Sequence, residues 1–176
     1  MNSGGDKMKK LIKIFLICTL MLLALCVTVS AETEGNFTYT VSSEKVTITG
    51  FPTDVGGEVI IPSVISGYPV TTISASAFKD CALITKITVP DSVTSIGVSA
   101  FRGCNALEEI TLPFVGKETG SEAYDEGNVF GYIFGYGSKQ ETNCVEQYYD
   151  NQTYNKTYYY IPSTLKKVTL TNEKTN

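Results

Sequence analysis

The feature that most constrains this chain is a 23-residue repeat. The stretch from Ile73 to Cys81 returns from Ile96 to Cys104 with its apolar positions in the same order. The match continues beyond both cysteines, where Ile84, Ile87, Val89 and Pro90 recur as Leu107, Ile110, Leu112 and Pro113. A fixed period of this length indicates a solenoid, in which one coil cannot bury its apolar side chains without its neighbours. Solenoids present extended surfaces to partners, so the repeat favours binding over catalysis.

Each repeat contains a short alternating segment that predicts a β-strand. In the first repeat Ile87 and Val89 would face inward, while Lys86 and Thr88 would face outward. Pro90 then ends the strand, because proline has no amide hydrogen for the ladder. The same alternation in the second repeat places Glu109 and Thr111 outward.

The rest of the repeat predicts a second side of the coil, which we call a wall, and the bend that leads into the next strand, which we call the corner. Val93 and Ile96 form a second inward pair, and the Ala-Phe dipeptides at 77–78 and 100–101 would fill the corner. Each coil then buries six or seven apolar side chains. The free energy gained by this burial offsets the conformational entropy lost by about 23 ordered residues only when coils stack on one another.

Partial copies flank the two repeats and suggest how the chain is organised. We expect a β-hairpin cap in 32–58, repeats in 59–113, an insertion in 114–160 and a final partial repeat in 161–176. The cap would be formed by the alternating segments 37–41 and 45–49, which flank a polar turn. No comparable segment covers the C-terminal edge, through which copies of the chain could self-associate.

The N-terminal segment 1–31 reads as a secretory signal peptide. Four lysines precede an apolar run over 14–29, which closes on the small-x-small pattern of Val29-Ser30-Ala31. A retained membrane anchor is the alternative, because the apolar run approaches spanning length. Cleavage would give a secreted or surface-exposed protein without membrane insertion.

Composition excludes several functions. Without residues 1–31 the chain has 145 residues with ten basic and seventeen acidic side chains, a net charge of −7. This charge argues against nucleic acid and anionic lipid as partners. The chain has no histidine, which excludes Ser-His-Asp and Cys-His catalysis and His-ligated zinc. We therefore expect no enzyme, no cofactor and no metal site.

Two cysteines occupy the same place in successive repeats. Cys81 and Cys104 would stack about 5 Å apart, as neighbouring strands do. Either a disulfide or a pair of buried free thiols fits this arrangement. Cys144 has no evident partner.

The insertion over 114–160 holds nine of the chain's eleven tyrosines. Insertions in solenoids often carry the binding site, and tyrosine offers a large contact area at low entropic cost. The alternative is a structural excursion whose aromatic rings pack on the repeats, with 129–135 as its most buried part. The candidate ligand-binding residues here are Tyr132, Tyr136, Tyr148, Tyr149, Tyr158 and Tyr159.

The repeat resembles the BspA-like, or Treponema pallidum-type, branch of the leucine-rich repeats. The resemblance covers about 37–113 and 161–171 and rests on the motifs Ala77-Phe78-x-x-Cys81, Ile84-x-x-Ile87-x-Val89-Pro90-x-x-Val93-x-x-Ile96 and Ala100-Phe101-x-x-Cys104. It implies a mostly β fold: a short leucine-rich-repeat solenoid with about 23-residue coils, an N-terminal hairpin cap and a Tyr/Gly-rich insertion.

The resemblance also implies a function. Members of this family are bacterial cell-surface or secreted proteins linked to adhesion. We therefore expect a non-catalytic protein that binds an extracellular protein or glycan on host or microbial surfaces. The alternative is a structural repeat segment or truncated paralogue without its own ligand. The outward strand positions Lys86, Thr88, Glu109 and Thr111 would contribute to the binding surface together with the tyrosines.

Overall fold

Parallel ladders bring equivalent positions of the two repeats side by side. Strand β7 (Ile84–Thr88) pairs with β9 (Glu109–Leu112), with Ile87 opposite Ile110. Strand β6 (Tyr68–Ile73) pairs with β8 (Ser95–Ile96), with Ile73 opposite Ile96. The partners in both ladders are 23 positions apart in the sequence.

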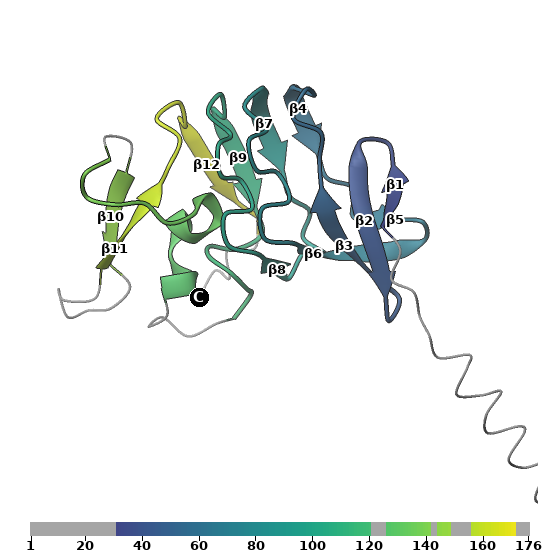
Figure 1. Cartoon of the computed structure of the whole chain (residues 1–176). Coiled ribbons are helices and arrows are strands. Elements are labelled where there is room, and N and C mark those ends of the chain that lie inside the picture. The colour runs from purple at the N-terminus through teal and green to yellow at the C-terminus, as the bar shows by residue number, and fades with distance from the viewer. Residues whose placement is uncertain (1–30, 121–125, 142–143, 149–155, 172–176) are drawn as a thin grey trace, which may run out of the picture. The chain divides into compact units, whose positions relative to one another are not determined.

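The computed structural model in Figure 1 describes residues 31–120, 126–141, 144–148 and 156–171. The described residues form twelve strands and two short 3₁₀ helices, which confirms the predicted mostly β class. No described helix is long and apolar enough to cross a membrane. The predicted signal peptide falls almost entirely on 1–30, outside the described residues.

One sheet contains four parallel strands in the order β12-β9-β7-β4, which Figure 1 shows side by side. Its outer members are β4 (Gly57–Ile60) and β12 (Lys167–Leu170). Equivalent positions line up across it, with Val59 opposite Ile87, Ile87 opposite Ile110 and Ile110 opposite Val168; the first three are buried, and Val168 on the edge strand is 44% exposed. The predicted final partial repeat is therefore in register with the earlier ones.

The second large sheet forms the opposite wall, and its first strands are those of the predicted hairpin. Strands β2 (Phe37–Ser42) and β3 (Lys45–Gly50) pair antiparallel. Ser43 and Glu44 make the turn with φ angles of 50° and 60°, the left-handed pair that suits a two-residue hairpin. The short strand β1 (Glu32–Glu34) pairs with β2, and β3 continues into the parallel β3-β6-β8 ladder. Strand β5 (Val64–Ile65) pairs antiparallel with β6.

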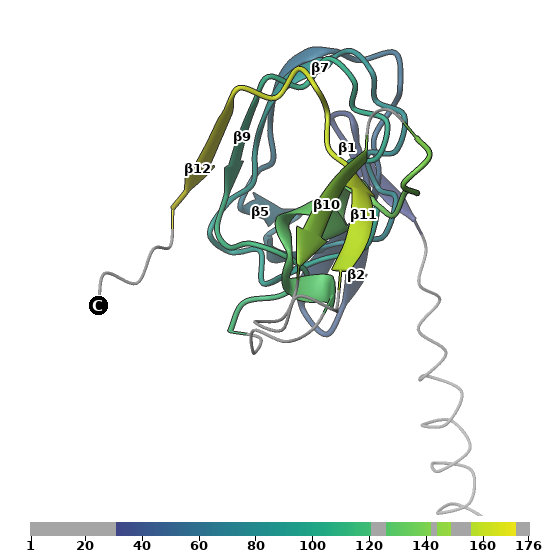
Figure 2. The ribbon, with the colours of Figure 1, turned by 90° about the vertical axis from the view of Figure 1, so that its left-hand side faces the viewer.

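Two short helices and a hairpin form a third part of the structure, which packs against the repeats. The 3₁₀ helices η1 (Glu126–Asn128) and η2 (Phe130–Phe134) precede a separate antiparallel hairpin of β10 (Cys144–Tyr148) and β11 (Lys156–Tyr160). Figures 1 and 2 both show this hairpin apart from the four-stranded sheet. We call it the tyrosine hairpin.

The core lies between the two walls and extends into the corner. The inward residues predicted from the first repeat, Ile84, Ile87, Val89, Val93 and Ile96, are all buried. The corner holds a row of aromatic rings in which Phe78 lies 5.3 Å from Phe101, and Phe101 lies 6.4 Å from Phe134, between ring centroids. Phe51 extends the row at 5.3 Å from Phe78.

Part of the insertion belongs to the aromatic row and therefore to the core of the repeats. The segment 114–160 was expected to interrupt the repeats, and 129–135 was expected to be its most buried part. Ile133 and Phe134 are fully buried and take the corner position that Ala100 and Phe101 hold in the preceding repeat. The amide of Phe101 donates to the carbonyl of Ile133 at 2.9 Å, as the amide of Phe78 does to Ala100 at 2.8 Å. The chain thus returns to the repeat in the middle of the insertion.

Register shows where the extra residues lie. Ile110 pairs with Val168, 58 positions later, which is 35 more than the 23 between Ile87 and Ile110. Phe134 follows Phe101 by 33 positions, which is ten more than the repeat period. Ten of the extra residues therefore lie before Phe134, and the other 25 lie between Phe134 and Val168. The tyrosine hairpin consists of residues from the second group, and its strands begin and end beside the corner.

Cys81, Cys104 and Cys144 are free thiols in the structure. Cys104 is buried, and its Sγ lies 3.3 Å from the carbonyl oxygen of Phe78. Burial raises the pKa of the Cys104 thiol to about 12, and it also raises the pKa of Cys81. These two cysteines therefore pack as small apolar residues, the second of the two alternatives left by the sequence.

We predict that Phe101→Ala destabilises the fold by about 3–5 kcal/mol, because it removes a fully buried ring between two others. The measurement is chemical denaturation of Ala31–Asn176, which form one compact unit. Phe130→Ala is the control, since Phe130 is half-buried at the end of the row and, among the aromatic rings of the described residues, contacts Phe134 alone. An unchanged unfolding midpoint for Phe101→Ala would contradict the packed corner.

We also predict that the same fragment exposes one reactive thiol when folded and three when denatured. The pKa values of all three thiols are raised, but Cys81 and Cys104 are fully buried, whereas Cys144 is half-buried and can be reached by a reagent. The measurement is titration with a disulfide reagent at about pH 8, with and without denaturant. A denatured, unreduced sample with a single thiol would show that Cys81 and Cys104 are joined instead.

Candidate ligand-binding surface

The outward face of the four-stranded sheet carries a row of alternating charges. Glu58, Lys86, Glu109 and Lys167 are successive partners across β4, β7, β9 and β12. Lys86 Nζ lies 2.9 Å from Glu58, and Lys167 Nζ lies 3.8 Å from Glu109. The hydrogen bond that the Lys86 ammonium donates to Glu58 raises the pKa of Lys86. The row is therefore neutral within itself.

A second outward row is uncharged and consists of Ile60, Thr88, Thr111 and Thr169. The predicted outward placement of Lys86, Thr88, Glu109 and Thr111 is confirmed, because all four alternate with buried neighbours. Their role in binding stays a prediction. The four charged side chains of the first row are paired, so these two rows offer no unpaired charge.

The outward face of the tyrosine hairpin has a different character. Strand pairing places Glu146 opposite Tyr158, with Tyr148 opposite Lys156 and Cys144 opposite Tyr160. Because side chains alternate along a strand, these six share one face. The face thus combines three tyrosines with one carboxylate, one ammonium and one thiol.

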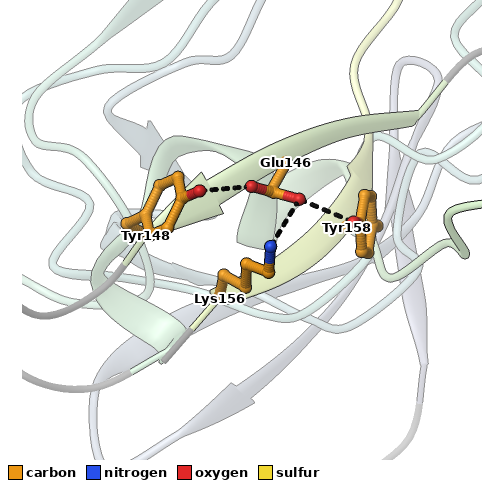
Figure 3. A network of polar contacts seen from close by, with 4 residues as sticks. All are labelled: Glu146, Tyr148, Lys156 and Tyr158. Carbon is orange, nitrogen blue, oxygen red and sulfur yellow. Dashed lines mark hydrogen bonds and ion pairs between the residues drawn. The ribbon is translucent and has the colours of Figure 1, made fainter. Parts of the chain in front are cut away.

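Glu146 is at the centre of this face, as Figure 3 shows. Its carboxylate accepts hydrogen bonds from the hydroxyls of Tyr148 at 2.5 Å and Tyr158 at 2.6 Å, and it lies 3.1 Å from Lys156 Nζ. These contacts, the two tyrosine hydrogen bonds first, lower the pKa of Glu146 to about 2. In turn they raise the pKa values of both tyrosines. The two rings are therefore held in place by their hydroxyl ends.

Tyr160 is held in the same way at the base of the hairpin. Its hydroxyl donates to Glu141, which lowers the pKa of that carboxylate and raises the pKa of Tyr160. The guanidinium carbon of Arg102 lies 4.6 Å from the centre of the Tyr160 ring. Arg102 belongs to the corner of the second repeat, so this cation–π contact joins the hairpin to the repeats.

The inner face of the hairpin packs on η2. Gln147 accepts a hydrogen bond from the amide of Gly131 at 2.6 Å. A side chain at Gly131 would place its Cβ 2.3 Å from the Cβ and Cγ atoms of Tyr159, so only glycine permits this close approach. Tyr159 is fully buried, with its ring 5.4 Å from that of Tyr136.

The predicted tyrosines therefore fall into different groups. Tyr148 is 48% exposed and Tyr136 37% exposed, while Tyr132 and Tyr158 are half-buried. Tyr159 has no exposed surface, so its inclusion among the ligand-binding candidates was wrong for the structure as it stands. Tyr149 lies outside the described residues.

Sequence reasoning missed a hollow at the base of the hairpin. It has a volume of about 350 Å³ and lies between the repeat corners and the segment that follows β11. We call it the corner groove, and its lining residues are Asp80, Arg102, Gly103, Asn105, Tyr160, Ile161, Pro162 and Ser163. No sequence motif joins these positions, because about 55 residues separate the two sides of the groove.

The described residues contain no group of three or more cysteines, aspartates and glutamates that could hold a metal ion. Much of the acidic segment near 121–125 lies outside the described residues. The charged side chains of the hairpin are engaged with tyrosines and with each other, an arrangement that stabilises a surface and leaves no carboxylate pair poised for acid–base chemistry there.

Comparison with known proteins gives a family match. Residues 71–169 match the family described as BspA type leucine rich repeat region, in six copies. No curated protein matches the chain.

Three solved structures resemble parts of the chain. A leucine-rich cell surface protein from Faecalibacterium prausnitzii is 31% identical over 47% of this chain and 23% of its own length, with a TM-score of 0.42. A leucine-rich-repeat protein of T. pallidum is 29% identical over 47% of this chain and 43% of its own, with a TM-score of 0.38. A third, from Bacteroides capillosus, is 30% identical over 49% and 75%, with a TM-score of 0.39. The chain thus spans less than half of the first two.

We predict that acid loosens the outward face of the hairpin between about pH 4.5 and 2. The pKa of Glu146 is lower in the folded state, about 2 against an ordinary 4.5. Its contribution to stability is therefore complete above pH 4.5 and is lost as the pH falls toward 2. The measurement is the near-ultraviolet circular dichroism of the tyrosines during an acid titration.

Glu146→Gln should remove that part of the titration, whereas Glu44→Gln, in the distant β2–β3 turn, should leave it intact. Superimposable titrations of the parent chain and Glu146→Gln would show that the carboxylate does not hold the two rings.

Proposed function

We propose, from the premise that this chain belongs to the BspA-type leucine-rich-repeat family, that it is a non-catalytic binding protein of the bacterial surface or secretions. Its ligand would be a protein or glycan on another cell or matrix. The signal-peptide pattern of residues 1–31 supports the extracellular location. The absence of histidine supports a role other than Ser-His-Asp or Cys-His catalysis.

The architecture belongs to the same proposal. The walls β3-β6-β8 and β4-β7-β9-β12 would be stacked coils of a short solenoid, each of about 23 residues before insertions. The β2–β3 hairpin would serve as its N-terminal cap, since β3 pairs with β6 and β2 covers the other edge of β3. The solenoid would then be the scaffold that presents the tyrosine hairpin.

The observation that carries the proposal is the outward face of the tyrosine hairpin. Tyr148 is 48% exposed, and its hydroxyl and that of Tyr158 are fixed on Glu146. A rigid tyrosine presents its ring to a partner without a large loss of rotamer entropy on binding. The outward sheet face is less suited, because its charges are already paired.

A structural role is the competing function, and one observation favours it. The inner face of the hairpin is packed as tightly as a core, with Tyr159 buried against Gly131. In that case the hairpin would only cover the last corner of the repeats. The two functions differ in whether the outward tyrosines can be removed without loss of binding.

The test compares binding of Ala31–Asn176 and two variants to immobilised extracellular-matrix proteins and glycans. We expect Tyr148→Ala to lower affinity by about tenfold or more, as expected for a central aromatic contact. Tyr68→Ala is the matched control, because Tyr68 is 38% exposed and lies on β6, away from the hairpin. Its binding should equal that of the parent chain.

Two results would contradict the proposal. Equal binding by Tyr148→Ala and by the double variant Tyr148→Ala/Tyr158→Ala would remove the hairpin face from the binding site. Absence of binding by all chains, once circular dichroism shows that they are folded, would leave the structural role.

A further inference from the structure

The corner groove differs from the other polar surfaces of the molecule. Its polar lining side chains are Asp80, Arg102, Asn105, Tyr160 and Ser163, with Ile161 and Pro162 as the apolar part. A volume of about 350 Å³ falls within the range of small-ligand sites. Two repeat corners provide one side, and the chain that leaves β11 provides the other.

Most of the polar groups in the groove have no partner within the part of the chain that the structure describes. The side chains of Asp80, Asn105 and Ser163 make no hydrogen bond or ion pair with any described residue. Arg102 stacks on Tyr160 but has no carboxylate within ion-pair distance among the described residues. On the sheet face and the hairpin, by contrast, most charged groups are paired. The groove thus gathers donors and acceptors that are available to a ligand.

Both sides of the groove are held by hydrogen bonds. The amide of Asp80 donates to the carbonyl of Arg102 at 2.7 Å, and the amide of Asn105 donates to Gly103 at 2.8 Å. On the other side, the Thr164 hydroxyl lies 2.9 Å from the Asn105 carbonyl and 2.8 Å from that of Leu107.

Two further contacts fix the ring in the groove. The amide of Tyr160 donates to Gly135 at 2.9 Å, and its hydroxyl is bound to Glu141. The backbone and the aromatic ring are therefore positioned before any ligand arrives, which lowers the entropic cost of binding.

We propose that the corner groove binds one residue of a neutral carbohydrate. A sugar offers adjacent hydroxyls that both donate and accept, and this matches a carboxylate, a guanidinium and an amide along one wall. The Tyr160 ring, Ile161 and Pro162 supply the apolar contact that the C–H face of a sugar needs. Asp80, together with the net charge of −7 beyond residue 31, disfavours an acidic sugar.

This inference rests on the proposed binding function and names the ligand class for one part of it. The groove and the outward hairpin face share Tyr160 but are otherwise made of different residues. Variants can therefore separate them. Asp80 has a φ of 62°, and asparagine tolerates that conformation, so Asp80→Asn removes the charge without straining the backbone.

The test screens Ala31–Asn176 against an array of neutral hexose and N-acetylhexosamine oligosaccharides and of sialylated and uronic-acid oligosaccharides. We expect binding to neutral members. Asp80→Asn and Arg102→Lys should each weaken it by about tenfold or more, because the first removes the charged acceptor and the second removes the planar fork of guanidinium donors. Glu44→Gln removes one negative charge in the distant β2–β3 turn and should bind as the parent chain does.

Three results would overturn the inference. Binding only to acidic oligosaccharides would exclude a neutral sugar. Neutral-sugar binding lost in Tyr148→Ala but kept in Asp80→Asn and Arg102→Lys would place the sugar on the hairpin face. Binding to matrix proteins through Tyr148, with no oligosaccharide bound, would reject the groove and leave the proposed function in place. Unaltered thermal unfolding of the variants confirms that each comparison is made between folded proteins.

Discussion

The row of stacked aromatic rings in the corner is the contact on which the rest of the molecule depends. Phe51, Phe78, Phe101 and Phe134 follow one another at centroid distances of 5.3 to 6.4 Å. Phe78 and Phe101 come from the corners of the two repeats, Phe51 directly follows β3, and Phe134 comes from the insertion. The buried ring of Phe134 covers Phe101, which would otherwise face solvent. The same burial fixes residue 135, from which the tyrosine hairpin departs.

Polar side chains on the sheet and the hairpin are paired with one another, whereas several in the corner groove are not. On the outward sheet face, Glu58, Lys86, Glu109 and Lys167 compensate one another across four strands. On the hairpin, Glu146 and Glu141 hold the tyrosine hydroxyls. Exposed pairs of this kind contribute little to stability, about 0–1 kcal/mol each, but they fix side-chain positions. In the corner groove the side chains of Asp80, Asn105 and Ser163 have no such partner among the described residues, so they are available to a ligand.

Much of the fold could be predicted from the sequence, because the repeat shows its own period. Alternation assigned Ile87 inward and Lys86 outward, and the structure agrees. Other features could not be predicted. The return of Phe134 to the corner is hidden by a spacing of 33 instead of 23. Tyr159 is buried because Gly131 admits it, a tertiary contact without a local signal. The groove joins Asp80 and Asn105 to Ser163, which come together only through pairing of β12 with β9.

The hairpin and the groove are rigidly connected, because Tyr160 is part of β11 and also lines the groove. Its ring lines the groove under Arg102, its amide is bound to Gly135 at the end of the corner, and its neighbour Tyr159 is the buried anchor of the hairpin. A ligand that contacts Tyr160 in the groove therefore touches the strand that also presents Tyr158. Since Tyr159 on the inner side of β11 is buried against Gly131, any shift of that strand would cost this packing. The two surfaces are thus held in a fixed relation, as a binding site for an extended ligand requires.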